Sequence, residues 1–188
     1  MNHKIATLFK TYLETLLWSD KVAGLVQTAS IGGDNPKSYP ISCDITAAAC
    51  LKGAYQDLCP NSKKKSVLYF EDKGISMVER AGTRLKFKSS LRLVGWLNLK
   101  LIQEAACDSE VDGCGSIGTY VIEVIKLLPT SPIQTADFVS IMVSDISEPE
   151  RSVDIFSKYS YSETETQFLL FPYAFFCLDL QIDFTIPC

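Results

Sequence analysis

The side chains best suited to catalysis are scarce in this chain. Histidine occurs once, at His3, in a terminal segment that we expect to fray. Ser–His or Cys–His catalysis needs an imidazole held rigidly beside its nucleophile, and most transition-metal sites also use imidazole ligands. We therefore interpret His3 as a solvated residue at the start of a helix and predict no catalytic or metal-binding role for it.

A glycine-rich motif precedes a predicted helix. Residues Gly113–Gly118 spell GxGxxG, the pattern of dinucleotide-binding loops. In those loops the glycines directly follow a strand, so that the pyrophosphate meets the helix N-terminus. Here polar residues separate the motif from the preceding strand, and Asp108, Glu110 and Asp112 would repel phosphate. The acid expected to bind ribose would be near Asp137, at the start of a strand rather than its end. The pattern favours a loop before a helix, and an unrecognised nucleotide-binding protein remains an alternative.

The cysteines have neither the number nor the spacing of a disulfide framework or a zinc site. Their count is odd, and the chain has enough apolar mass to fold without cross-links. Zinc-binding cysteines usually form pairs two to four residues apart, whereas six residues separate the closest ones here. We interpret them as packing thiols. They are Cys43, Cys50, Cys59, Cys107, Cys114, Cys177 and Cys188.

Two pairs of carboxylates are candidates for acid–base catalysis. Asp145 with Glu148, and Glu163 with Glu165, lie in polar stretches. Acid–base catalysis needs a carboxyl pKa raised by apolar surroundings, and these stretches offer none. The sequence therefore predicts a protein that is not an enzyme and has no catalytic residues, no cofactor and no metal.

Periodic apolar residues predict the elements around these positions. A stripe at helical spacing from Ile5 to Leu17 predicts an N-terminal helix that ends near Trp18–Asp20. The apolar run Phe168–Cys177, interrupted by Pro172, is interpreted as core. Further strands are expected at Val22–Ala29, Ser38–Ile45, Ser66–Phe70 and Phe138–Ile146, and a helix at about Thr119–Leu128.

Residues 84–101 carry the clearest signal. Apolar side chains recur at odd positions and polar ones at even positions, which predicts a strand with one buried and one wet face. At about 3.3 Å per residue it would reach about 60 Å, so it either wraps a barrel-like core or projects as a hairpin arm. Bends are expected at Ser89–Ser90 and Gly95. Before this strand, a turn is expected at Glu71–Gly74 and a new strand from Ile75.

The last strand, residues 176–186, alternates in the same way. Its outer face carries acidic residues, while that of 84–101 carries basic ones. If the two strands are adjacent, cross-strand ion pairs would contribute a few tenths of a kcal/mol each. The candidate subunit-interface or channel residues are Arg84, Lys86, Lys88, Arg92, Asp179 and Asp183.

Charge is distributed unevenly between the two halves of the chain. Residues 1–102 hold 15 Lys/Arg and 8 Asp/Glu, whereas residues 103–188 hold 3 and 14. Either the halves interleave in one sheet and neutralise each other, or each subunit presents a basic and an acidic face through which copies dock head to tail. The basic stripe is either a solvated strand face or the lining of a DNA channel.

Length and composition suit a single domain, residues 1–188. Apolar residues make up 47% of the chain and charged ones 21%, as in ordinary globular proteins. The expected class is α+β, with a mainly antiparallel sheet or partly closed barrel of long strands, an N-terminal helix and one internal helix packed on it. A projecting arm or loop is expected within 46–82 and 103–117. Neither a membrane span nor a secretory signal is predicted, so we expect no membrane partner.

Two stretches resemble the neck, tail-terminator and tail-completion proteins of tailed bacteriophages. One is the opening helix leading through Leu17–Asp20 into Val22–Val26 and Ser38–Ile41. The other is Tyr159–Glu163 followed by Phe168–Tyr173 and the strand to Ile186. The order of elements is similar as well. No single motif is diagnostic, and this chain has more cysteines than that family leads one to expect.

The resemblance implies a structural protein of the virion, assembled in the host cytoplasm. Its partners would be copies of itself in a hexameric or dodecameric ring, the adjacent portal, neck or tail proteins, and DNA contacted non-specifically in the channel. A tail-tube or capsid-associated subunit is a close alternative. A soluble binding module is an alternative from another class.

Overall fold

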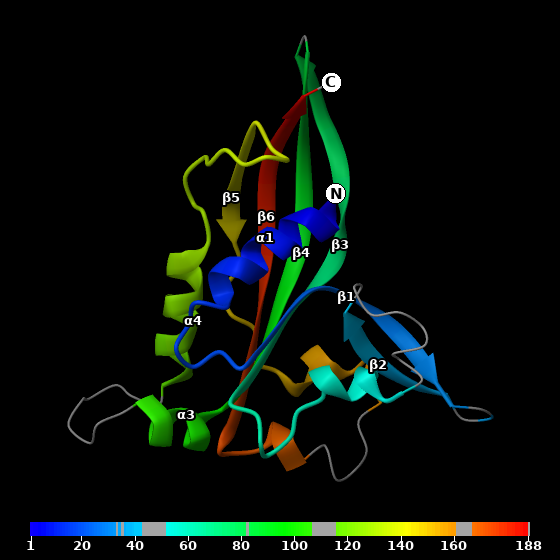
Figure 1. The fold of residues 1–188 in the computed structure, drawn as a ribbon, viewed down its shortest axis with the longest axis vertical. Helices are drawn as coiled ribbons and strands as arrows, with labels where there is room; N and C mark the ends of the chain where they lie inside the picture. The colour runs from blue at the N-terminus through cyan, green and yellow to red at the C-terminus, as the bar shows by residue number, and fades with distance from the viewer. Residues whose placement is uncertain are drawn as a thin grey trace.

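An open six-stranded sheet forms the centre of the molecule (Figure 1). The computed structural model describes residues 1–32, 34, 36–42, 52–81, 83–106, 116–160 and 167–187. The strand order is β2-β1-β3-β4-β6-β5, and every neighbouring pair is antiparallel except β1 and β3. The expected α+β class is confirmed, with an open sheet rather than a barrel. The strands are β1 (Lys21–Ile31), β2 (Lys37–Ser42), β3 (Ser66–Ala81), β4 (Arg84–Asn98), β5 (Ser140–Ile146) and β6 (Tyr173–Pro187).

Helices cover one face of this sheet. Two helices bury apolar side chains in the larger core, against those of β3, β4, β5 and β6. The first helix contributes Ile5, Phe9 and Leu13, and a later helix contributes Val121 and Val124. This face therefore depends on the apolar stripe that predicted the first helix. The α-helices are α1 (Asn2–Leu13), α3 (Leu99–Ala106) and α4 (Ile117–Leu127).

A second, smaller core lies on the opposite face. Short 3-10 helices supply Leu58, Ile155 and Phe156, which pack with Tyr69 and Trp96 of the sheet. This cover reaches only one end of β4, so residues 93–98 are buried on both faces while residues 84–92 alternate between buried and wet positions. The 3-10 helices are η1 (Ala54–Leu58), η2 (Val153–Phe156) and η3 (Gln167–Leu169).

The two longest ribbons predicted from alternation lie side by side. β4 and β6 pair from Arg84↔Pro187 to Asn98↔Tyr173 without a register shift. No bulge therefore interrupts this pairing at Ser89–Ser90 or Gly95, the expected sites of a bend or bulge. Gly95 serves a different purpose, because a Cβ there would lie 2.4 Å from the Phe176 ring. The glycine lets that buried ring cross the neighbouring strand.

The expected turn at Glu71–Gly74 is wrong, because β3 continues through it. The register with β4 shifts between Asp72 and Gly74, so one extra residue bulges out of the strand. Gly74 takes φ 113°, and its N–H donates to Asp72 Oδ1 at 2.7 Å. A glycine bulge thus accommodates the residues that suggested a turn. As a result, β3 is one strand as long as its partner.

The ends of two elements also differ from expectation. α1 ends at Leu13, and Leu17 is 92% exposed, because the chain turns there to enter β1 while buried Trp18 fills the core. β4 ends at Asn98, and the predicted strand residues 99–101 begin α3. The Asn98 Oδ1 accepts from the Leu101 N–H at 3.3 Å, as a side chain at a helix start does.

Other expectations match or fall outside the described residues. The internal helix α4 and strand β5 lie where they were expected, and β1 with β2 forms the expected hairpin. The described part of its second strand ends at Ser42. The cap expected at Ser162 and Glu165, and residues 107–115 of the expected 104–116 loop, are not among the described residues.

Candidate functional site

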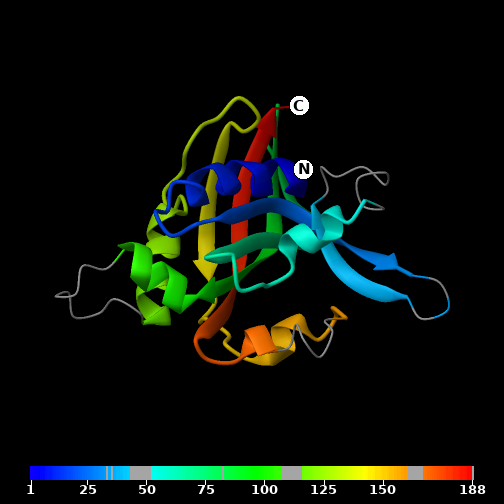
Figure 2. The same ribbon diagram turned by 60° about the horizontal axis from the view of Figure 1, so that its bottom comes forward.

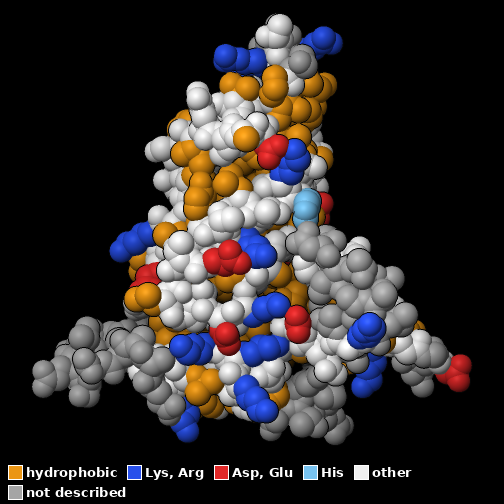
Figure 3. Space-filling view, viewed as in Figure 1, with side chains coloured by type: hydrophobic (Ala, Val, Ile, Leu, Met, Phe, Trp, Pro, Cys, Tyr) orange, Lys and Arg blue, Asp and Glu red, His pale blue; other side chains and the backbone are white. Residues whose placement is uncertain are grey.

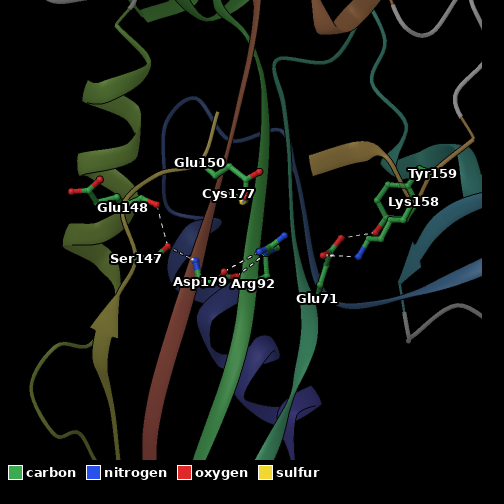
Figure 4. A network of polar contacts seen from close by, with 9 residues as sticks. All are labelled: Glu71, Arg92, Ser147, Glu148, Glu150, Lys158, Tyr159, Cys177 and Asp179. Carbon is green, nitrogen blue, oxygen red and sulfur yellow. Dashed lines mark hydrogen bonds and ion pairs between the residues drawn. The ribbon is translucent and has the colours of Figure 1, made fainter. Parts of the chain in front are cut away.

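A polar network crosses the sheet beside the second core (Figure 4). Register places Arg92 opposite Asp179, and the guanidinium donates to both carboxylate oxygens, Nε to Oδ1 at 2.7 Å and Nη2 to Oδ2 at 2.9 Å. The hydrogen bonds that Arg92 donates lower the pKa of Asp179. The same hydrogen bonds raise the pKa of Arg92. The expected pairing of the basic and acidic ribbons is confirmed at this position. These two charges are neutralised within one chain.

Glu71 is the buried carboxylate of this network. It is 5% exposed, accepts from the Tyr159 hydroxyl at 2.7 Å, and pairs with the Lys158 ammonium at 2.6 Å. Such contacts compensate a buried carboxylate for the hydration that it loses. The contacts hold the loop after η2 against β3, which is a structural role.

Removing the Tyr159 hydroxyl should therefore destabilise the fold. Tyr159→Phe is expected to lower the free energy of unfolding by about 1.5–3 kcal/mol, because the lost hydrogen bond is made to a charged group. Tyr12→Phe is the control, since no hydrogen bond of its hydroxyl is found in the described part of the chain, and it should change stability by less than about 0.5 kcal/mol. Urea unfolding measures both variants. Equal effects would contradict the assigned role of the Tyr159–Glu71 bond.

Cys177 shows why the thiol in this network is unsuited to nucleophilic chemistry. It is 2% exposed, and its Sγ lies 3.3 Å from Glu150 Oε2. Burial, followed by the hydrogen bond to Glu150, raises the pKa of Cys177 to about 12. A thiol, rather than the reactive thiolate, is present at neutral pH. Cys59 is also buried, in agreement with a packing role; the other five cysteines lie outside the described residues.

Alkylation should reveal the raised pKa of Cys177. In the native protein at pH 8, iodoacetamide should modify Cys177 on the order of 1000-fold more slowly than after unfolding, because its thiolate fraction is lower. Because the pKa of Cys177 is higher in the folded than in the unfolded chain, its protonated thiol stabilises the fold below about pH 9. This contribution to the free energy of unfolding is lost as the pH rises toward 12. Peptide mass spectrometry resolves this site from the other cysteines. Modification of Cys177 at equal rates in both states would refute the assignment.

The other sequence candidates for chemistry do not converge. Asp137 pairs with Lys4 of α1. In the glycine motif, Ser116 caps α4 by accepting from the Gly118 N–H, while residues 113–115 lie outside the described residues. Asp145 and Glu148 are exposed, as expected. Within the described ranges, no cluster of His, Cys, Asp and Glu could hold a metal ion.

Beyond Glu71, β3 is the exposed edge of a sheet that continues through β4, β6 and β5 (Figure 1). β1 pairs with β3 only as far as Val26↔Glu71 and then diverges with β2 (Figure 2). Residues 74–81 of β3 therefore pair with β4 on one side and with no described strand on the other. We call residues 74–81 and 83–90 the arm. It includes part of the 46–82 stretch in which an arm was expected.

The arm carries exposed apolar side chains. Ile75, Met77 and Val78 are 48%, 63% and 55% exposed. Figure 3 shows hydrophobic side chains below the tip of the molecule and basic groups at the tip. Sequence reasoning missed these three residues as a surface because it placed a turn before them. Ile75 and Met77 lie opposite Ser89 and Phe87 of β4, whereas Val78 lies at the register shift between Met77 and Glu79.

Four of the six candidate interface residues lie on the arm or beside it. Lys86 pairs with Glu79 at 2.9 Å, and Arg84 and Lys88 are exposed. Asp183 is the register partner of Lys88, and its Oδ1 is buried without a hydrogen-bond partner in the described structure. Arg92 and Asp179 lie further along the ribbons, in the intrachain pair.

A hollow of about 140 Å³ lies over the end of the sheet formed by β3, β4, β6 and β5. The residues that line it include Val78, Phe87, Met142 and Phe184, together with Lys86, Lys88 and Asp183.

At the other end of the sheet, Leu170 and Phe171 are 66% and 90% exposed. This turn corrects the interpretation of the whole run 168–177 as core.

Comparison with known proteins found no matching family model and no matching curated protein. None of the helices in the described part of the chain has the length and apolar character needed to cross a bilayer. The surfaces of the molecule therefore provide the main argument for function.

Proposed function

We propose that this chain is a non-enzymatic structural subunit of a phage virion, which forms an oligomeric ring in the head-to-tail connector or the tail terminator. The arm is the observation that carries the proposal. It extends the sheet beyond the part that α1 and β1 cover, and leaves Ile75, Met77 and Val78 facing solvent in a single copy. Contiguous exposed apolar side chains on a strand edge are typical of surfaces that bind another chain.

Charge supports contact between copies. Residues 74–90 contain four basic residues and one acidic residue, while residues 145–154 contain four acidic residues and one arginine. Electrostatic complementarity of this kind orients an interface. The proposed partners are copies of this chain and neighbouring portal, neck or tail proteins. Arg84 and Lys88 would supply the phosphate contacts if the ring channel admits DNA.

The mass of the purified chain tests this proposal. Light scattering should give about six or twelve times 20.9 kDa, and electron microscopy should show closed rings. Mass spectrometry of purified phage particles should then detect the chain. A chain that stays monomeric both alone and with neck or tail proteins would overturn the proposal in favour of a soluble binding module. An open tube would favour the tail-tube alternative.

A further inference from the structure

Exposed Phe171 and the hollow beside the arm lie toward opposite ends of β6. Phe171 precedes the start of β6 at Tyr173, whereas Phe184 of the hollow lies near the end of this strand. Eleven residues of extended strand separate Tyr173 from Phe184, which corresponds to about 36 Å. Phe171 therefore cannot reach the hollow of its own chain.

The hollow has the size and lining to hold one aromatic ring. Its volume of about 140 Å³ is close to the roughly 150 Å³ of an engineered apolar cavity that binds benzene. Val78 and Met142 provide apolar contact, whereas the rings of Phe87 and Phe184 stack on each other on the core side of the same strands. Lys86 and Lys88 could lie against the face of an inserted ring as cation–π partners.

The surroundings of the two features are complementary in charge. The rim of the hollow belongs to the basic arm. The acidic stretch 145–154 runs toward the Phe171 end, since Glu150 bridges to Cys177 and the adjoining Phe156 packs on Phe175. An arm that receives Phe171 would thus approach an acidic surface. Exposed Val153 adds apolar area there.

We propose that Phe171 of one copy inserts into the hollow of a second copy, with Leu170 packing against the exposed apolar side chains of the arm. The contact is head to tail, because the inserted residue and its receptor are different surfaces of the same chain. Repetition of such a contact generates a closed ring or an open filament. The inference rests on the proposed function and identifies the surfaces that would join neighbouring subunits.

Phe171→Ala tests the inserted side. It should weaken association at least about 100-fold, as loss of a central aromatic anchor does, while the melting temperature of the subunit stays unchanged because Phe171 is 90% exposed. Leu17→Ala is the matched control, since Leu17 is 92% exposed elsewhere and should associate normally. Sedimentation velocity over a dilution series measures both.

Ser140→Trp tests the receiving side, because Ser140 lines the hollow and an indole there would fill it. This variant should not form rings by itself. When Ser140→Trp is mixed with Phe171→Ala, the Phe171 of the first variant can enter the intact hollow of the second. No further copy can add to this pair, so the mixture should contain one-to-one dimers. Circular dichroism confirms that each variant is folded before mixing.

The outcomes separate this inference from the proposed function. A wild-type oligomer that Phe171→Ala leaves intact would overturn the inference and leave the ring proposal standing. Folded variants that fail to form the mixed dimer would exclude the hollow as the receptor. A wild-type chain that is monomeric alone and with its neighbours would overturn both proposals.

Discussion

Gly95→Ala is expected to lower the free energy of unfolding by about 3 kcal/mol, a large fraction of the stability of a typical domain. The new Cβ would lie 2.4 Å and 2.6 Å from two carbons of the Phe176 ring and 3.0 Å from Leu68 Cδ2. Both neighbouring side chains are fully buried, so neither moves without disturbing the larger core. Urea unfolding followed by circular dichroism measures the loss.

A second glycine provides the control for this prediction. At Gly24 a Cβ would meet only Thr7, at 3.7 Å or more, so Gly24→Ala should be neutral or slightly stabilising. Phe176→Leu should cost less in the Gly95→Ala background than in the wild type, since it removes the clashing ring. Additive effects of the two substitutions would show that the clash does not determine the stability loss.

Met77→Glu is expected to weaken self-association at least about 100-fold while leaving the subunit folded. Met77 is 63% exposed in the single chain, so a charge there is solvated in the monomer. In a contact between arms and neighbouring copies, the same carboxylate would be buried without a partner. Sedimentation velocity detects the loss of oligomer, and thermal unfolding verifies the fold.

The control for the arm is an equally exposed apolar residue on another element. Ile122 of α4 is 53% exposed, and Ile122→Glu should leave association unchanged. If both variants dissociate the oligomer, the effect is one of added charge rather than of position. If neither does, the arm is not part of the contact.

The sequence predicted the long ribbons because their environment follows a simple period. In residues 84–92 of β4 the even-numbered positions are more exposed than the odd-numbered ones, so the alternation of polar and apolar side chains is strict. The same reasoning extended β4 too far, since Leu99 continues the odd-numbered pattern but begins a helix. Periodicity at the end of an element does not distinguish a last strand residue from a first helical one. The turn assigned at Gly74 failed for a related reason, because glycine serves bulges as well as turns.

The candidate site could be predicted only in part. Opposite charges on two alternating strands predicted ion pairs between them if they were adjacent, but the register that joins Arg92 to Asp179 came only from the structure. Glu71 was not predicted, because its partners Lys158 and Tyr159 lie far away in the sequence and meet it only through the folded sheet. The exposure of Phe171 was hidden within an apolar run that is otherwise core. Whether an apolar residue faces core or solvent in a turn depends on tertiary structure.

The charged residues of the two ribbons differ in how far they are neutralised within the chain. Where the second core ends, Arg92 and Asp179 satisfy each other within the chain. Beyond that point Arg84 and Lys88 remain exposed on the arm. Arg92 and Asp179 therefore neutralise each other within the chain, whereas Arg84 and Lys88 have the exposure that docking between copies would need.

The position of the arm in the assembled particle shows whether neighbouring copies contact each other through it. Cryo-electron microscopy of the purified oligomer should resolve the arm of each subunit packed against the next copy, with Ile75 and Met77 buried in the contact. A ring whose arms project free into solvent, or images of single subunits alone, would contradict the account.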